Sequence, residues 1–263
     1  MVTLAGSVPA SAATYHASLD GVSATLTYGG TSTDPHGTTL RVSEGGRVVY
    51  ASAVTTKFCG RLCWPEPSYG SGGGNPVRVV RLAPGTPDVV LSLYSGGAHC
   101  CYVDLVLRPT SPTHFVPVEL ELGDPGARLE VLAGNPDAAV VTADDTFAYA
   151  FTDFAASGLP LKILRLRGAG FVDVTRQYPG LVSRDASRWL AAFHSMAGQH
   201  YDDSVGLIAA WAADEYLLGR ATYADAYLDQ QADLGHLRSL LTPSMSGRAF
   251  VAQLEKFLRA RHY

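Results

Sequence analysis

The stretch "VVLSLYSGGAHCCYVDLVL" (residues 89–107) decides the fold of this chain. Two apolar runs rich in Val, Leu and Tyr flank a polar turn with two glycines, a pattern that predicts two β-strands joined by a short connection. Ser95, His99, Cys100 and Cys101 lie in or beside that turn. Because these residue types can act in catalysis or binding, and cysteines can also form structural disulfides, the stretch bears on function as well as on fold.

Similar short runs recur from about residue 15 to residue 178, separated by Gly, Pro, Asp and Asn. Segments such as "GVSATLTY", "TTLRVSEGGRVVYASA" and "HFVPVELEL" predict further strands, and Gly45-Gly46 is typical of a hairpin turn. "GTPDVVLSLYSG" at residue 85 is echoed by "GNPDAAVVTADD" at residue 134. A repeat unit of about 50 residues is the size of one propeller blade or stacked sheet motif. We therefore predict a mainly antiparallel β domain, either partial propeller-like or a sandwich.

The apolar period changes to that of helices after "QYPGLVSRD" (residues 177–185). Helices are expected after Ser183 as an N-cap, from Val205 to Gly219, from Thr222 with Asp225 as a capping pair, and after Pro243. The acids of "HYDDS" (200–204) and "DEY" (214–216) are interpreted as helix caps. The predicted class is α+β, with a β domain at residues 15–178 and a four-helix domain at residues 179–263.

Charge and hydropathy exclude two classes of partner. The chain has 24 acidic and 20 basic residues, so it lacks the basic excess that nucleic-acid binding requires. It also lacks an apolar run of about 18 residues, so we predict no membrane span. Residues 1–14 end in the small-residue segment "VPASAA", which predicts either a truncated signal peptide or a flexible N-terminus. The favoured location is secreted, extracellular or in the cell envelope.

Cys59, Cys63, Cys100 and Cys101 are the four cysteines of the chain. In an exported protein we expect all four in disulfides. Adjacent strand residues point to opposite faces, which favours bridges from the "CGRLC" loop to Cys100 and Cys101, worth about 3 to 4 kcal/mol by loop entropy. The alternative pairs Cys59 with Cys63 and Cys100 with Cys101. The Cys-x2-Cys pairs of structural zinc sites are absent, so we predict no metal and no cofactor.

The candidate binding residues are Tyr94, Ser95, His99, Asp144 and Asp145. Ser95 is not in a Gly-x-Ser-x-Gly pattern, so its turn is not that of a hydrolase nucleophile. Asp144 and Asp145 occupy the corresponding turn of the second repeat, where adjacent acids bind a cation or are simply solvated. Trp64, Tyr69 and Tyr94 form either an exposed aromatic patch for a glycan or peptide or part of a core.

The segments "YSGGAHCC" and "DDTFAYAFTDFAASGLPLKILRLRGAGFVDVTR" resemble a group of uncharacterised secreted proteins or lipoproteins of actinobacteria. The resemblance covers roughly residues 77–180, and it implies export and a disulfide-linked β region without supplying a reaction. The strand rhythm is also similar to the FG-GAP repeats of β-propellers. The chain lacks the Asp-x-Asp-x-Asp-Gly calcium loop of those repeats, so calcium binding is not implied.

The sequence is compatible with two functions. The first is a secreted or envelope-associated binding protein whose partner is a macromolecule, a glycan or a small ligand. The second is a secreted hydrolase with a site between the β domain and the helices, built from the polar turns that carry Ser95, His99, Asp144 and Asp145. No catalytic triad, metal motif or carboxylate pair emerges from the sequence, which favours the binding protein.

Overall fold

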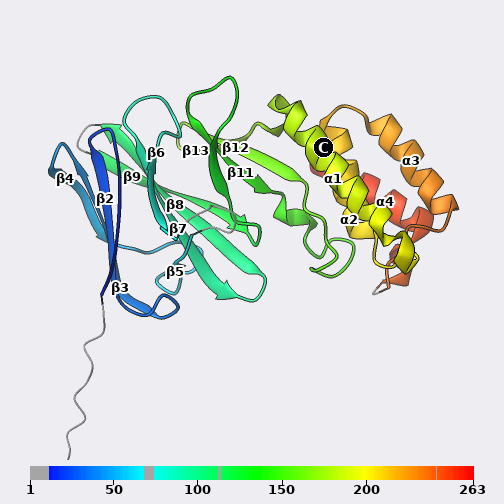
Figure 1. The fold of residues 1–263 in the computed structure, drawn as a ribbon, viewed down its shortest axis with the longest axis horizontal. Helices are drawn as coiled ribbons and strands as arrows, with labels where there is room; N and C mark the ends of the chain where they lie inside the picture. The colour runs from blue at the N-terminus through cyan, green and yellow to red at the C-terminus, as the bar shows by residue number, and fades with distance from the viewer. Residues whose placement is uncertain (1–11, 68–73, 112–113, 241) are drawn as a thin grey trace, which may run out of the picture. The chain divides into compact units, whose positions relative to one another are not determined.

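The computed structural model describes residues 12–67, 74–111, 114–240 and 242–263 (Figure 1). Tyr69 and residues 1–11 of the predicted leader lie outside these ranges. Ala13 and Thr14, which the leader was expected to include, already belong to the first strand. Within the described residues the chain forms three β-sheets followed by four α-helices, which confirms the predicted α+β class.

The first sheet has the order β1-β2-β3-β4 and the second the order β5-β7-β8-β9, with β6 also paired to β7. The third sheet has the order β10-β11-β12-β13. The strands are β1 (Ala13–Leu19), β2 (Val22–Gly30), β3 (Pro35–Glu44), β4 (Arg47–Ala53), β5 (Trp64–Pro65), β6 (Val77–Val80), β7 (Asp88–Gly97), β8 (Cys100–Ser111), β9 (His114–Gly123), β10 (Arg128–Val131), β11 (Ala138–Ala143), β12 (Leu161–Arg167) and β13 (Gly170–Asp173).

The predicted hairpin at Gly45-Gly46 is confirmed. Glu44 of β3 pairs with Arg47 of β4, so the loop has two residues. Gly45 and Gly46 have φ values of +56° and +83°, the left-handed conformation that such a loop requires at both positions. Glycine adopts it without the steric cost of a Cβ atom.

β7 and β8, the inner strands of the second sheet, are buried on both faces along most of their length. Side chains alternate along a strand, so Leu91 and Leu93 of β7 face one side and Val90 the other. Leu91 and Leu93 belong to a core shared with Leu26 and other residues of the first sheet. Val90 packs in a separate core that includes Leu166 of β12. This two-sided burial explains why β7 is an almost continuous apolar run and not an alternating one.

The repeated Gly-x-Pro-Asp openings stand before equivalent strands. Asp88 begins β7, and its carboxylate accepts the backbone N–H of Leu82 at 3.0 Å. Asp137 directly precedes β11, and its N–H is held by the Asn135 side chain at 2.9 Å. Each opening therefore leads into an inner strand of a sheet, so the two copies of the repeat correspond to the second and third sheets.

The helices are α1 (Pro179–Ser195), α2 (Val205–Leu217), α3 (Ala221–Asp233) and α4 (Gly247–Ala260). α1 begins four residues before the expected cap, because Pro179 occupies the first turn, where its fixed φ and missing N–H cost nothing. Ser183 is therefore inside the helix and its carbonyl accepts the Ser187 hydroxyl. α3 likewise begins without a side-chain cap from Thr222, and Asp225 instead accepts the Tyr216 hydroxyl at 2.5 Å.

α2 is the central helix and packs against α1, α3 and α4 (Figure 1). Eleven of its thirteen residues are buried, from Val205 to Tyr216. A helix surrounded by others must be apolar nearly all round, which is what "VGLIAAWAADEYL" supplies. Trp211, Phe193 and Phe250 are almost fully buried in the same core.

The described chain divides into two compact units. The first runs to Val140 and adds Arg165–Phe171, and the second contains Val141–Leu164 and Val172–Tyr263. The last strand ends at Asp173 and the first α-helix begins at Pro179. The second unit therefore contains all four α-helices together with parts of β11, β12 and β13.

The cysteines pair as Cys59 with Cys63 and Cys100 with Cys101. This corrects the favoured pairing and matches the alternative. Cys59 and Cys63 lie in one tight loop in which Thr56 and Gly60 exchange backbone hydrogen bonds of 2.9 Å, and their Cα atoms are 5.7 Å apart, inside the usual disulfide range. The β7–β8 register shifts between Tyr94 and Gly97, so the regular alternation assumed for residues 100 and 101 does not hold at that end.

The pairing leads to a prediction about thiol chemistry and stability. Alkylation of the folded, oxidised protein should add no label, and alkylation after reduction and unfolding should add four. Because the loop between Cys59 and Cys63 is short, replacing both by Ser should lower the free energy of unfolding by only about 2 kcal/mol. Intact mass and urea denaturation measure the two results, and labelling of two or more thiols in the native protein would contradict the pairing.

Candidate functional site

The predicted binding residues of the β7–β8 turn hold the turn together. The Ser95 hydroxyl accepts the backbone N–H of Cys101 at 2.7 Å. The Tyr94 hydroxyl donates to the carbonyl of Gly97. His99 is exposed beside these contacts. The hydroxyls of Tyr94 and Ser95 are thus engaged in hydrogen bonds that fix the local backbone.

Trp64 explains why the turn contains glycine. A Cβ atom placed on Gly96 would overlap the Trp64 ring, so the indole covers the backbone there. The Trp64 Nε1–H donates to Glu66 at 2.8 Å, and the ring meets Tyr94 edge to face at 5.6 Å. Trp64 and Tyr94 are both half-buried in this cluster, which is a packed element of the turn.

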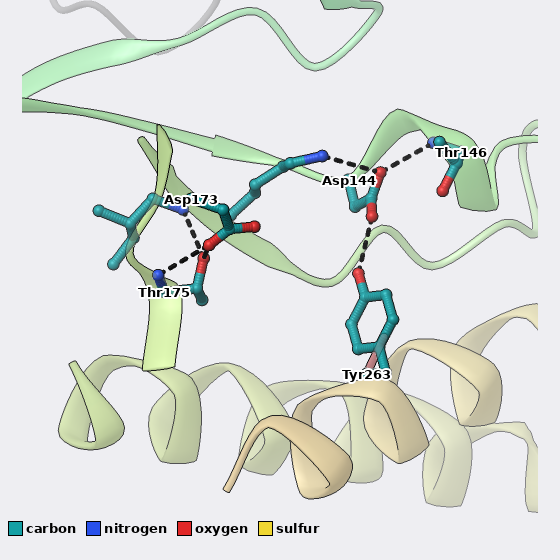
Figure 2. Close-up of polar contacts among 7 residues, drawn as sticks. Asp144, Thr146, Asp173, Thr175 and Tyr263 are labelled. Carbon is teal, nitrogen blue, oxygen red and sulfur yellow. Dashed lines mark hydrogen bonds and ion pairs between the residues drawn. The ribbon is translucent and has the colours of Figure 1, made fainter. Parts of the chain in front are cut away.

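Asp144 occupies a different environment, in the second unit. It follows β11 and is only 7% exposed, which corrects the expectation of a solvated turn. Its Oδ1 accepts the Thr146 N–H at 3.2 Å and lies 3.4 Å from the Lys162 ammonium, and its Oδ2 accepts the Tyr263 hydroxyl at 2.8 Å (Figure 2). Asp145 opens a short 3-10 turn that ends at Phe147 and is half-buried.

These contacts set the protonation states at Asp144. Burial by itself raises the pKa of the carboxyl, but Lys162, the Tyr263 hydroxyl and the Thr146 amide together hold that pKa below its usual value. Burial and then the Asp144 charge raise the pKa of Tyr263, so its hydroxyl stays protonated. Asp144 is therefore a fixed, ionised group whose two oxygens both accept hydrogen bonds.

A cavity of about 340 Å³ lies beside this cluster within the second unit. Its lining residues are Asp144, Leu161, Lys162, Asp173, Val174, Thr175, Arg176, Gln177, Leu217, Arg261, His262 and Tyr263. They come from the residue after β11, from β12 and β13, from the segment before α1, from the end of α2 and from the three residues after α4. The cavity is thus lined by positively and negatively charged side chains and by three aliphatic side chains.

The strand side of the cavity is fixed by a short chain of hydrogen bonds. The Oδ1 of Asp173 accepts the N–H of Thr175 at 2.8 Å and its hydroxyl at 2.6 Å (Figure 2). The Thr175 hydroxyl in turn accepts the N–H of Ile163 at 2.9 Å. Asp173 itself is exposed, so its carboxylate is held in place while remaining accessible.

The helix side is fixed by Arg176. Its guanidinium donates to the carbonyls of Tyr216 and Leu217 at 3.1 Å and 2.9 Å, and to that of His262 at 3.2 Å. The last carbonyls of a helix have no partner inside the helix, and a cation there also complements the helix dipole. Arg176 therefore completes the end of α2 and ties it to His262.

A buried acid pair adjoins this region. Asp185 accepts the N–H of Leu161 and the indole N–H of Trp189, each at 3.0 Å, and pairs with Arg188 at 2.6 Å. Asp214 is fully buried, and neither of its oxygens receives a hydrogen bond from a donor group of the described chain. Burial first, and then the Asp185 carboxylate, raise the pKa of Asp214 to about 10. Asp214 is therefore protonated at neutral pH, and its O–H is available to donate to the neighbouring Asp185.

The sequence identified Asp144 but not the residues that surround it. Asp214 was interpreted as a helix cap, whereas it lies inside α2, and its position in "AAWAADEYL" was a usable signal of burial. Lys162, Asp173, Arg176 and Tyr263 gave no pattern, because they lie on separate elements. In the structure Asp144 lies beside these residues at the cavity. Tyr94, Ser95 and His99 lie instead at the β7–β8 turn of the first unit.

Searches for known relatives give little functional information. No protein family model matches the chain, and no solved structure matches it. The chain is 27% identical over 199 residues to the uncharacterized protein y4bJ of Sinorhizobium fredii. The match covers 68% of this chain and 29% of that protein, so the chain is similar to less than a third of a longer relative.

The structure also bears on two other classes of site. Within the described ranges, no group of three or more His, Cys, Asp or Glu side chains is arranged to hold a metal ion. No helix among the described residues is long and apolar enough to cross a membrane.

Gly96→Ala tests the packing of the turn. The new methyl group would collide with the Trp64 ring at a backbone φ of +85°. We expect a loss of about 2 to 4 kcal/mol in the free energy of unfolding, from strain and overpacking together. The matched control is Gly21→Ala, which has a similar φ of +84° with no atom within 4 Å. It should lose only about 1 kcal/mol, and equal losses in urea denaturation would show that the Trp64 contact does not matter.

The acid pair predicts an unusual pH dependence of stability. In the unfolded chain Asp214 loses its proton near pH 4, whereas in the folded protein it keeps the proton to about pH 10. Unfolding therefore releases a proton between these values, and this group lowers stability as pH rises. In Asp214→Asn the side-chain amide N–H can donate to Asp185 in place of the carboxyl O–H. The amide does not titrate, so unfolding of this variant releases no proton from position 214.

We therefore expect Asp214→Asn to be more stable than the wild type by about 1 to 3 kcal/mol near pH 8, and the difference to shrink toward about pH 4. Urea denaturation across this range measures it. The exposed Asp229→Asn is the control, because it removes the same charge type without a buried neighbour. A stability difference that does not change with pH would contradict the raised pKa of Asp214.

Proposed function

We propose that this protein is an exported binding protein, secreted or held in the cell envelope, that takes a small polar ligand into the cavity beside Asp144. The observation that carries this proposal is the cavity itself. Its walls are fixed by hydrogen bonds at Asp144, Asp173 and Arg176, and it presents both positive and negative groups. Pockets with a few well-placed polar groups among apolar ones are the usual sites for small ligands.

The cysteine pairing supports export. All four cysteines are in disulfide pairs, and such pairs persist in oxidising compartments and are rare in the cytosol. The small-residue segment "VPASAA" near the N-terminus is consistent with the end of an export signal. Export also agrees with the resemblance to secreted actinobacterial proteins at "YSGGAHCC".

The chemistry of the cavity favours binding over hydrolysis. A general base needs a pKa near the working pH and access to a proton on the substrate. Asp144 is ionised and both of its oxygens are occupied, and Tyr263 stays protonated. The Thr175 hydroxyl already donates to Asp173 and accepts from Ile163. These groups hold the walls in place, which suits a site that recognises a ligand without transforming it.

Methyl NMR on the whole chain tests this proposal. Leu161, Val174 and Leu217 line the cavity, so their methyl signals report on its occupant. We expect at least one pool of amino acids, sugars, organic acids or nucleosides to shift these signals without being consumed. Leu217→Trp, which fills the cavity, should abolish the shift.

Leu240→Trp is the control, because Leu240 is exposed and does not line the cavity. Methyl signals elsewhere in the core, such as those of Ile208, show whether each variant is folded. If no pool shifts the cavity methyl signals, the cavity is not a binding site. If a compound is converted during the titration, the protein is an enzyme and the binding proposal is wrong.

A further inference from the structure

Three cationic side chains, Lys162, Arg176 and Arg261, line the cavity beside Asp144. Lys162 uses one contact, to Asp144. Arg261 stacks over the Phe257 ring at 3.6 Å, a contact to the face of its guanidinium that leaves the N–H edge available. Among the described residues neither Arg176 nor Arg261 forms an ion pair with a carboxylate, although both line the cavity. These cationic side chains favour a ligand that carries an anionic group.

Asp173 favours a ligand that also carries a cationic group. Its Oδ1 is engaged by Thr175, and its Oδ2 has no hydrogen-bond partner within the described chain. An exposed carboxylate oxygen at a cavity wall accepts a hydrogen bond best from a charged donor such as an ammonium group. Asp144 adds a second fixed negative charge to the same cavity. A dianion such as phosphate would meet both carboxylates, whereas a carboxylate that carries its own ammonium group would not be repelled.

The remaining walls are apolar. Leu161, Val174 and Leu217 present aliphatic side chains, and Val174 is 5% exposed. The volume of about 340 Å³ lies at the small end of ligand pockets, which run from roughly 300 to 1,000 Å³. Such a space suits a compact molecule with one aliphatic part better than a segment of polymer.

We infer that the cavity binds a free amino acid with an aliphatic side chain. Arg176 and Arg261 hold its carboxylate, Asp173 holds its ammonium group, and Leu161, Val174 and Leu217 contact its side chain. This inference rests on the proposed binding function and names the ligand class for the same cavity. Both charged ends are required, because either end alone leaves one charged wall without a partner.

Three probes with the same isobutyl group test the inference on the wild-type protein. They are L-leucine, 4-methylpentanoate, which lacks the amino group, and 3-methylbutylamine, which lacks the carboxylate. Titration followed by the methyl signals of Leu161 and Leu217 gives a dissociation constant for each. We expect L-leucine to bind, and each analogue to bind at least about tenfold more weakly, since a charge-assisted contact is lost.

Two variants test which residue binds each charged end of L-leucine. Asp173→Asn keeps an oxygen that can accept from Thr175 but loses the charge, so it should weaken L-leucine at least about tenfold and leave 4-methylpentanoate unchanged. Arg261→Gln should weaken both of these ligands. Lys256→Gln removes an exposed cation that is on α4 but does not line the cavity, and it should change neither.

The outcomes separate this inference from the proposed function. If 4-methylpentanoate or 3-methylbutylamine binds as tightly as L-leucine, the requirement for both charges is wrong. If L-leucine does not shift the cavity methyl signals but a compound of another class does, the ligand class is wrong and the binding function stands. If no compound shifts them, both are wrong. A folded Asp173→Asn variant that binds L-leucine normally also overturns the assignment of the ammonium site.

Discussion

The burial of β7 and β8 on both faces is the constraint from which the β region is built. A strand with one exposed face can place a polar residue at every second position, whereas a strand covered on both sides cannot. In the middle of these strands Ser92 and Asp104 are buried polar residues, and they lie directly opposite each other in register. Asp104 accepts the Ser92 hydroxyl at 2.5 Å, and Arg78 of β6 donates to Ser92 at 2.7 Å. Ser92, Asp104 and Arg78 thus form one connected set, separate from Asp88 at the start of β7, which accepts the Leu82 N–H.

The same constraint explains which parts of the fold were visible in the sequence. The runs around Leu91 and Leu105 are long and apolar, so strands were predicted there, and the change of period after Pro179 located the helices. The repeated Gly-x-Pro-Asp openings, read from the amino acids alone, indicated equivalent strands. These features depend on local periodicity, which a single sequence carries in full.

Features that depend on neighbours in space were not visible. The disulfide pairing depends on how the loop at Cys59 closes and on an irregular strand end at Cys100, and neither has a signature in spacing. Asp144 was noticed as one of two adjacent acids, but its partner Tyr263 is 119 residues away. A periodic pattern shows which residues are buried, and it does not show which buried residues meet.

Asp144 and Asp214 show what that missing information decides. Both are aspartates with almost no exposure in the same unit, and burial raises the pKa of each. Asp144 faces Lys162 and two hydrogen-bond donors, so it is ionised. Asp214 faces Asp185, so it keeps its proton. Neighbours alone thus give one residue type two opposite charge states. Neither state changes near neutral pH, so Asp144 keeps its negative charge at the cavity wall there and Asp214 adds no charge beside it.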